Sequence, residues 1–394
     1  MRNMTETPLP TGCTSWIETH LDALSQNTCA FRERLTQPSR LIAVVKSNAY
    51  GHGATLVVPA LQRAGADGFA VVNLAEGIAV RQITGPKPPI IVLGLIPHGD
   101  LGVAIEQDLQ PTIYDELSVR ALALAARTQH KTARVHIKIE TGTNRQGVRG
   151  KELLRIVSTI ANSPGVEIAG VSTHFADIED TTNHDFAGQQ IARFQREIDG
   201  VRWPSGETPP RHNACSAAAI LFPETHLELV RIGIGLYGLW PSRETLVAAR
   251  ERKLVGLQLE PAMSWKCLVA QVKDVPTGDY VSYGRSWRAT RPSKIAVLPV
   301  GYFDGYPRAL SDKAHVLIAG RRARVVGRVC MNMMMVDVTD LPEPRCGDTV
   351  VLLGCSGNER LRAEELADWA GTIHYEIVSR INPALPRIAS SSEH

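Results

Sequence analysis

Residues 41–53 read Leu-Ile-Ala-Val-Val-Lys-Ser-Asn-Ala-Tyr-Gly-His-Gly, an apolar run followed by one lysine and a turn with two glycines. The run Leu41–Val45 is short and uninterrupted, which is typical of a strand covered on both faces of a parallel sheet. The polar residues and glycines after it predict a tight turn. We therefore expect Lys46 at the open end of a buried strand.

The same pattern of an apolar run followed by a helical segment recurs along the chain from Leu41. Helical segments are expected at Glu116–Gln129, Lys151–Ala161 and His184–Ile198. Eight such units predict an α/β fold, a (β/α)8 barrel of the TIM type. The seventh unit has a weak strand and a short helix. The eight expected strands are Leu41–Val45, Phe69–Val72, Ile90–Leu95, Pro111–Tyr114, Val135–Glu140, Val166–Thr173, a segment around His212–Ala214, and Leu229–Ile234.

The pattern changes after about Arg252, where Gly-Asp pairs separate extended runs such as Lys294–Val300 and His315–Ala319. This alternation of turn residues and extended runs predicts a mostly β domain, with one short helix at Ala363–Ala370. We expect a disordered tail at 1–13, a barrel domain at 14–250, a C-terminal β domain at 251–388, and a tail at 389–394. A first strand at about 15–20 is a candidate to pair with the β domain.

Composition narrows the class of protein. A chain of 394 residues is long enough for about two domains, and its 44% hydrophobic content is that of a globular protein. The net charge of +3 is too small to indicate a surface that binds nucleic acid or an anionic membrane. Seven scattered cysteines without CxxC spacing favour a reducing compartment. No export signal, membrane span or metal site is indicated, so we expect a cytoplasmic protein.

Basic and hydroxyl residues follow strand after strand of the expected barrel. Taken singly, each has an ordinary explanation as a solvated lysine, a helix cap, a core histidine or half of an ion pair. Together they lie at the C-terminal strand ends, where barrel enzymes carry their chemistry and bind phosphate. They predict a phosphate-bearing cofactor joined to a lysine that its apolar neighbours keep neutral. These residues are Lys46, Lys138, His174, Ser216 and Arg231.

Residues 43–53 closely resemble the cofactor-lysine motif of alanine racemases, the pyridoxal 5′-phosphate (PLP) enzymes that interconvert L- and D-alanine. The resemblance extends over Ser15–Arg387. It implies that Lys46 is the PLP lysine and one of two catalytic bases, and that Tyr283 in Val281–Gly284 is the other. It also implies a phosphate-binding set made of Tyr50, Ser216, Gly233, Ile234 and Tyr375.

The resemblance assigns further cofactor and substrate contacts. His174 resembles the residue stacked on the cofactor ring, and Arg231 the arginine that faces its pyridine nitrogen. Arg145 resembles the arginine that contacts the phenolic oxygen and the substrate carboxylate. Lys138 stands where the family often has a carbamylated lysine, which would brace Arg145.

Two loops of the β domain resemble those that narrow the substrate entrance in the family. Residues 301–306 and 327–332 include Tyr302 and Met331, which are implied substrate contacts. In the family these loops come from the partner subunit. The resemblance therefore implies a homodimer in which each subunit completes the active site of the other, and a product, D-alanine, that feeds peptidoglycan synthesis.

Several positions depart from the commoner family pattern, and three alternatives remain. Glu140 replaces an aspartate, Thr143-Asn144 replaces Met-Gly, Cys215 replaces an asparagine, and Asn332 replaces an aspartate. These changes leave the reaction type intact and the substrate preference open. The alternatives are a racemase of serine or basic amino acids, a PLP-dependent decarboxylase that would use Cys330, and a PLP-binding protein without activity.

Overall fold

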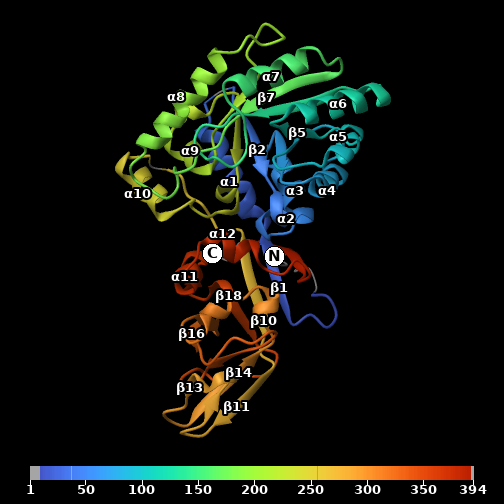
Figure 1. The fold of residues 1–394 in the computed structure, drawn as a ribbon. Coiled ribbons are helices and arrows are strands. Elements are labelled where there is room, and N and C mark those ends of the chain that lie inside the picture. The colour runs from blue at the N-terminus through green and yellow to red at the C-terminus, as the bar shows by residue number, and fades with distance from the viewer. Residues whose placement is uncertain (1–8, 37, 255, 392–394) are drawn as a thin grey trace, which may run out of the picture. The chain divides into compact units, whose positions relative to one another are not determined.

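The computed structural model describes residues 9–36, 38–254 and 256–391. Contacts divide the chain into two compact units (Figure 1). The first, here called the barrel unit, comprises Leu24–Ser47 and Val58–Glu260. The second, the β unit, comprises Met1–Ala23, Asn48–Val57 and Pro261–His394.

The barrel unit is built on one sheet of eight parallel strands, as predicted. The order is β8-β7-β6-β5-β4-β3-β2-β9. The gap between β8 and β9 is bridged where the Arg231 N–H donates to the Ala214 carbonyl at 3.1 Å, so the barrel is nearly closed. The strands are β2 (Arg40–Val44), β3 (Gly68–Val71), β4 (Ile90–Val92), β5 (Gln110–Ile113), β6 (Ala133–Lys138), β7 (Val166–Ser172), β8 (Arg211–His212) and β9 (Leu229–Ile232).

Helices lie outside the barrel strands (Figure 1). The expected helices at 116–129 and 151–161 are confirmed as α6 and α7, and the third begins one residue later than expected, as α8. Side-chain caps set the first turns of α4, α6 and α10, where Asn73, Asp115 and Ser242 accept backbone N–H groups. The helices are α1 (Leu21–Arg34), α3 (Ala54–Arg63), α4 (Leu74–Thr84), α5 (Leu101–Glu106), α6 (Glu116–Gln129), α7 (Lys151–Ala161), α8 (Asp185–Asp199), α9 (Ser216–Leu221) and α10 (Arg243–Glu251).

The β unit is mostly β, as predicted, and its main sheet has the order β11-β14-β17-β16-β15-β18-β10-β1-β20. Strand β1 pairs antiparallel with β10 and parallel with β20, so both ends of the described chain enter this sheet. The expected helix at 363–370 is confirmed as α11 (Ala363–Ala370), and α12 (His374–Ser379) follows it. The sheet strands are β1 (Ser15–His20), β10 (Met263–Leu268), β11 (Gln271–Val275), β14 (Ser293–Leu298), β15 (His315–Ile318), β16 (Arg321–Val325), β17 (Met334–Asp337), β18 (Thr349–Ser356) and β20 (Arg387–Ser390); β19 (Glu359–Leu361) pairs with β18.

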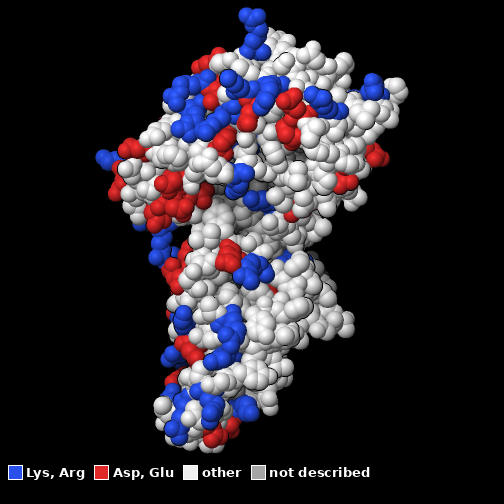
Figure 2. All heavy atoms as spheres, in the orientation of Figure 1, with Lys and Arg blue, Asp and Glu red and all other residues white. Residues whose placement is uncertain are grey.

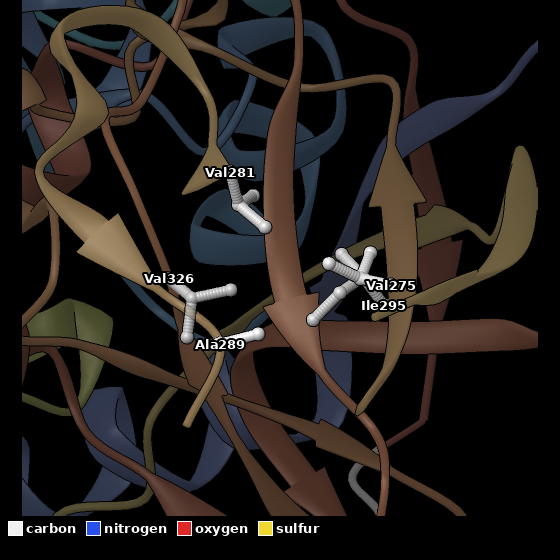
Figure 3. Close-up of a cluster of buried hydrophobic side chains, with 5 residues drawn as sticks. All are labelled: Val275, Val281, Ala289, Ile295 and Val326. Carbon is white, nitrogen blue, oxygen red and sulfur yellow. The ribbon is translucent and has the colours of Figure 1, made fainter. Parts of the chain in front are cut away.

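A small apolar cluster anchors the hairpin of β12 (Tyr280–Val281) and β13 (Trp287–Arg288) (Figure 3). It is fully buried and draws on β11, β12 and β14 and on the ends of two neighbouring segments. Because Val281 lies in this cluster, the chain is fixed two residues before Tyr283. The members are Val275, Val281, Ala289, Ile295 and Val326.

The tails expected at both ends fall largely outside the described residues, since 1–8 and 392–394 are not described. Strand β20 extends to Ser390, into the segment expected as the C-terminal tail. None of the described helices is long and apolar enough to cross a membrane. On the face drawn in Figure 2, basic and acidic side chains are interspersed over both units.

Candidate active site

Lys46 begins a left-handed turn directly after strand β2. The turn, α2 (Lys46–Tyr50), holds four successive residues at φ between 52° and 56°. None of them is a glycine, so the conformation costs roughly 1–2 kcal/mol per residue. The Glu76 carboxylate stabilises the start of the turn by accepting the N–H groups of Ser47 at 2.6 Å and Val72 at 2.9 Å. The backbone directly after Lys46 is thus held in a strained, left-handed conformation.

The surroundings of the Lys46 amine favour its neutral form. Burial lowers the pKa of Lys46, and the positive charge of Arg145 lowers it further. Glu76 and Glu179 act in the opposite direction, with smaller effects. A half-buried lysine with a lowered pKa has the properties of the nucleophile that the sequence led us to expect at this position.

Four basic side chains lie close enough to His174, in the loop after β7, to influence its pKa. Burial lowers the pKa of His174 well below its usual value, and Lys138, Arg231, Arg145 and Lys46 add to this effect. Lys138 ends β6, and its pKa is also lowered well below normal, by burial and then by Arg231 and Arg145. The strand ends therefore bring Arg145, Arg231 and two lysines with lowered pKa values near a neutral imidazole, an arrangement that suits an anionic ligand.

Hydroxyl and amide side chains hold the loop of His174 to the loop that carries Arg145. The His174 carbonyl accepts from the Thr143 hydroxyl at 2.8 Å and from the Gln190 amide at 3.2 Å. The hydroxyls of Thr141 and Thr173 are 2.7 Å apart, and Gln190 also donates to Thr141 at 3.1 Å. Sequence reasoning missed Thr141, Thr173 and Gln190 as supports, although Gln190 was visible as a polar residue in an apolar helical stripe.

Arg231 is 6% exposed and is fixed by carbonyl and imidazole acceptors. Its Nη1 donates to His212 Nδ1 at 2.6 Å and to the His212 carbonyl at 2.8 Å, while Nη2 donates to the Thr173 carbonyl at 2.8 Å. A guanidinium has five N–H donors, so two remain without a partner among the described residues. Burial lowers the pKa of Arg231 to about 10, which leaves it charged at neutral pH.

Ser216 and the β9–η3 junction form a polar cradle. The Ser216 hydroxyl accepts the N–H groups of Gly233 at 3.0 Å and Gly235 at 3.4 Å, so its own hydrogen is available to donate. A Cβ on Gly235 would lie 2.5 Å from the Phe31 ring, which explains why this position is glycine. Ile234 between them is buried, in η3 (Ile234–Tyr237). The Asn213 side-chain oxygen nearby along the chain is buried and has no partner among the described residues.

Cys215, a departure from the family pattern, is a neutral buried thiol. Its Sγ lies 3.6 Å from a Glu179 carboxylate oxygen, to which it donates. Burial raises the pKa of Cys215 to about 12, and Glu179 raises it further. Cys215 therefore supplies a weak donor instead of an amide beside Ser216.

In the β unit, Tyr50 and Tyr375 lie together. Their ring centroids are 6.2 Å apart, and the planes are tilted by 51°. A Cβ on Gly51 would lie 2.0 Å from the Val378 carbonyl, so the turn packs directly against α12, which carries Tyr375. Arg387 secures the same turn by donating to the Gly51 carbonyl at 3.1 Å.

A second group in the β unit gathers the other predicted residues on exposed loops. Tyr283 is 74% exposed, and Tyr302 and Met331 are exposed as well. The preceding Ser282, at φ 70°, donates through its hydroxyl to the Arg328 carbonyl at 2.7 Å. The N–H of Tyr302 donates to the Cys330 carbonyl at 3.0 Å. Segment 328–331 thus connects the loops of Tyr283, Tyr302 and Met331.

The two units therefore assemble different parts of the predicted site. The barrel unit gathers Lys46, Lys138, Arg145, His174, Ser216, Arg231, Gly233 and Ile234 at the strand ends. The β unit holds the Tyr50–Tyr375 pair and the exposed Tyr283 loops. Two family models match consecutive parts of the chain: the description "Alanine racemase, N-terminal domain" matches residues 19–241 and "Alanine racemase, C-terminal domain" matches 262–389.

The chain belongs to the alanine racemase family. It is 38% identical over 373 residues to the alanine racemase of Halothermothrix orenii, covering 95% of this chain and 96% of that one. It is 36% identical over 374 residues to that of Leptospira interrogans, covering 95% of both chains.

Solved alanine racemase structures have the same fold. The enzyme from Bacillus anthracis, with bound L-Ala-P, superposes with a TM-score of 0.89 at 34% identity, over 97% of this chain and 96% of that one. The enzyme from a D-cycloserine-producing Streptomyces lavendulae gives 0.88 at 34% identity, over 98% and 99%. The enzyme from Bartonella henselae, which carries covalently bound pyridoxal phosphate, gives 0.84 at 27% identity, over 96% and 100%.

The histidines in this racemase barrel predict loss of stability in acid. Burial, then Arg231 and Arg40, lower the pKa of His136 from 6.5 to about 3. Below pH 6.5, His136 therefore binds a proton in the unfolded chain but not in the folded chain. Stability is fully present above pH 6.5 and falls towards pH 3, by about 1.4 kcal/mol per pH unit for each such histidine.

This loss can be measured by thermal unfolding at pH 7.5, 6.0 and 5.0. We expect the melting temperature of His136→Asn, which has no group to protonate, to fall less steeply with pH than that of the wild type. Parallel curves for the two proteins would contradict the assignment of a neutral, buried His136.

Proposed function

We propose that this protein interconverts L-alanine and D-alanine with PLP attached at Lys46, and that the D-alanine it makes supplies peptidoglycan synthesis. The observation that carries the proposal is the half-buried Lys46 amine, whose pKa is lowered by burial and by Arg145 at the strand ends of a racemase barrel. The family of the chain and its end-to-end similarity to alanine racemases support the same reaction.

The residues present fit PLP. The lowered pKa of Lys46 favours the neutral amine that an aldehyde requires, and the Ser216 hydroxyl, which keeps its hydrogen to donate, suits a phosphate. The two unpartnered N–H donors of Arg231 suit a ring nitrogen that only accepts. We propose that the phosphate is held by Tyr50, Ser216, Gly233, Ile234 and Tyr375, and that His174 stacks on the ring.

When bound, PLP withdraws electrons from a joined amino acid and so makes its Cα proton acidic. The residues of this chain then have to move that proton. Lys46 takes or returns it on one face of Cα, and Tyr283 does so on the other. Arg231 holds the ring nitrogen without giving it a proton, because a guanidinium stays charged. Arg145 neutralises the substrate carboxylate, and Met331 and Tyr302 limit the size of the side chain.

We propose that Tyr283 acts in the active site of a second copy of this chain, in a homodimer. Tyr283 is one of several large exposed side chains on neighbouring loops of the β unit, with Tyr302, Phe303, Met331 and Met333. Exposed apolar groups gathered in this way are typical of a protein interface. Size-exclusion chromatography with light scattering should give twice the 43.0 kDa mass of the chain.

We also propose the boundaries of the two domains and the cellular compartment of the protein. Residues 14–250 would be the cofactor-binding domain and 251–388 the second domain, in agreement with the two family matches. All seven cysteines are free, which suits the reducing cytoplasm.

We expect Lys138 to form a carbamate with carbon dioxide. The amine is buried with a strongly lowered pKa, and no carboxylate forms an ion pair with it among the described residues. A neutral amine adds to CO2 and releases one proton, and the new anion would be stabilised by Arg145 and Arg231. Protein exchanged into 13C-bicarbonate should show one carbamate 13C signal that is missing in Lys138→Ala. A spectrum without that signal in the wild type would refute the modification.

Turnover tests the proposed reaction against its alternatives. Purified protein with added PLP should form D-alanine from L-alanine far faster than it racemises serine, lysine or arginine. Faster turnover of one of the other amino acids would change the assigned substrate but keep the proposed mechanism. Release of CO2 with formation of the corresponding amine would identify a decarboxylase, and a bound cofactor without any turnover would leave only a PLP-binding protein.

A further inference from the structure

A chain of hydrogen bonds runs from Arg231 into the barrel, away from the proposed cofactor site. His212 Nδ1 accepts from Arg231 at 2.6 Å, and His212 Nε2 lies 2.8 Å from His136 Nδ1. His136 Nε2 in turn lies 2.9 Å from the Gln110 side-chain oxygen. The two histidines are 0% and 1% exposed, and their rings meet edge to face. The chain links β9, β8, β6 and β5.

The direction of every bond in this chain is fixed by Arg231. A guanidinium can only donate, so His212 Nδ1 is the acceptor and carries no hydrogen. A neutral His212 then has its hydrogen on Nε2 and donates it to His136 Nδ1. A neutral His136 likewise has its hydrogen on Nε2 and donates to the Gln110 oxygen. Burial and nearby cations, which lower the pKa of both histidines, keep the two rings neutral.

The barrel makes specific room for His136. The pairing of β6 with β7 shifts register between Val135 and His136, because β7 has one extra residue, Ala169, at this point. His136 is paired with Gly170, where a Cβ would lie 2.6 Å from His136 Nδ1. Any other residue at 170 would displace the ring from His212.

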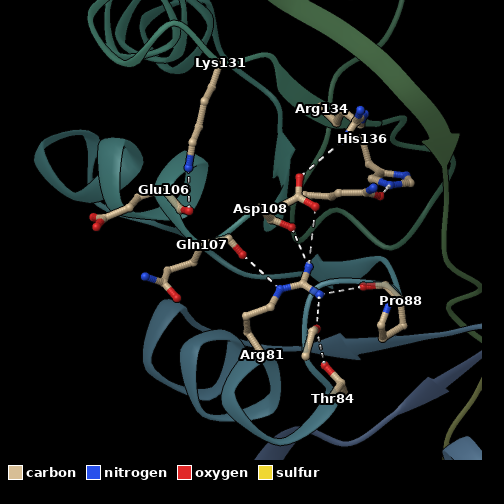
Figure 4. Close-up of polar contacts among 11 residues, drawn as sticks. Arg81, Thr84, Pro88, Glu106, Gln107, Asp108, Lys131, Arg134 and His136 are labelled. Carbon is tan, nitrogen blue, oxygen red and sulfur yellow. Dashed lines mark hydrogen bonds and ion pairs between the residues drawn. The ribbon is translucent and has the colours of Figure 1, made fainter.

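The segment before Gln110 is also fixed (Figure 4). Arg81 donates to the carbonyls of Gln107 at 3.0 Å and Asp108 at 2.7 Å, and Arg134 pairs with the Asp108 carboxylate at 3.2 Å. These bonds fix the start of β5, and with it Gln110, the last residue in the series of hydrogen bonds.

We propose that His136 and Gln110 are positioning residues for Arg231, which act by locking His212 in the tautomer that accepts from the guanidinium. Without the acceptor on His136, His212 could move its hydrogen to Nδ1, which would then face the N–H of Arg231 and repel it. The catalytic consequence rests on the proposed function, since Arg231 is the residue proposed to hold the ring nitrogen. The tautomer of His212 does not depend on it.

Two substitutions at His136 separate the two ring nitrogens. His136→Asn places an amide oxygen near the former Nδ1 and keeps the acceptor for His212. His136→Gln reaches the former Nε2 position and loses that acceptor. We expect His136→Gln to lower kcat of the PLP-loaded enzyme by about tenfold to a hundredfold, because a buried donor is left unpaired and Arg231 is released. His136→Asn should stay within about threefold of wild type, since the bond is kept.

The second readout is the histidine ring nitrogen spectrum of 15N-labelled full-length protein, with and without PLP. Wild type and His136→Asn should show His212 with an unprotonated Nδ1 and a protonated Nε2. In His136→Gln and in Gln110→Met, which removes the final acceptor, that signal should shift towards the other tautomer. Gln110 is only partly buried, so we expect Gln110→Met to fold. It can therefore test the inference if His136→Gln does not fold.

The outcomes distinguish the inference from the proposed function. A protonated His212 Nδ1 in the wild type would overturn the inference, whatever reaction the protein catalyses. Equal loss of kcat in His136→Asn and His136→Gln, in step with equal losses of melting temperature, would reduce His136 to a structural role and also overturn it. If the protein racemises no amino acid but His212 has the expected tautomer, the proposed function is refuted and the inference about the histidine pair holds.

Discussion

Replacing Lys46 with alanine should reduce the racemisation of alanine by at least about 10⁴-fold, the largest effect of any single change. The substitution removes both the amine that joins the cofactor and one of the two proposed bases. The measurement is D-alanine formation at saturating PLP.

The control for this variant is Lys151→Ala, which changes an exposed lysine at the start of α7. It should keep wild-type turnover and PLP absorbance. A Lys46→Ala protein that still racemises alanine within a hundredfold of wild type would refute the role of Lys46 as cofactor lysine and base.

Replacing Tyr283 with phenylalanine should lower racemisation by about 10²–10⁴-fold while PLP still binds at Lys46. The phenol oxygen is the only group lost and the ring is kept, so the melting temperature should not change. Loss of turnover with full cofactor occupancy separates a base from a cofactor ligand.

The matched control is Tyr280→Phe in the same hairpin. Tyr280 is 49% exposed and lies three residues before Tyr283, in strand β12. We expect it to retain full activity. Equal losses in Tyr280→Phe and Tyr283→Phe would point to the integrity of the loop and contradict proton transfer by Tyr283.

Much of the barrel could be predicted because its strands are uninterrupted apolar runs. Helices α6 and α7 were predicted to the residue, since both combine a strong 3.6-residue period with clear ends. The weakest expected strand, around His212–Ala214, proved to be two residues long, at Arg211–His212. Its partners are set by the barrel and not by its own sequence.

The left-handed turn after Lys46 could not be predicted. Residues 47–50 contain no glycine, and only Asn48 readily tolerates a positive φ. The conformation is imposed by non-local contacts, including the Glu76 carboxylate that accepts the Ser47 N–H. Local sequence signals carry no information about such a partner 29 positions away.

The predicted site residues share a simple signal, a basic or hydroxyl residue near a strand end. In the structure each lies in the last two residues of a barrel strand or within four residues after one: Lys46, Lys138, His174, Ser216 and Arg231. The supporting residues lack that signal. His136 lies inside β6, and its partner His212 is 76 positions away. Thr143 was noted as a departure from the family pattern, but its bond to the His174 carbonyl became evident only in the structure.

The central claim is that Lys46 and Tyr283 serve opposite faces of Cα. The most direct measurement is the exchange of the Cα hydrogen in D2O, followed by NMR separately from L-alanine and from D-alanine, with wild type and Tyr283→Phe. Wild type should exchange and racemise both enantiomers. Tyr283→Phe should still exchange one enantiomer through Lys46, without inversion, and should not exchange the other. Equal loss of exchange from both enantiomers, or continued racemisation by the variant, would contradict the two-base account.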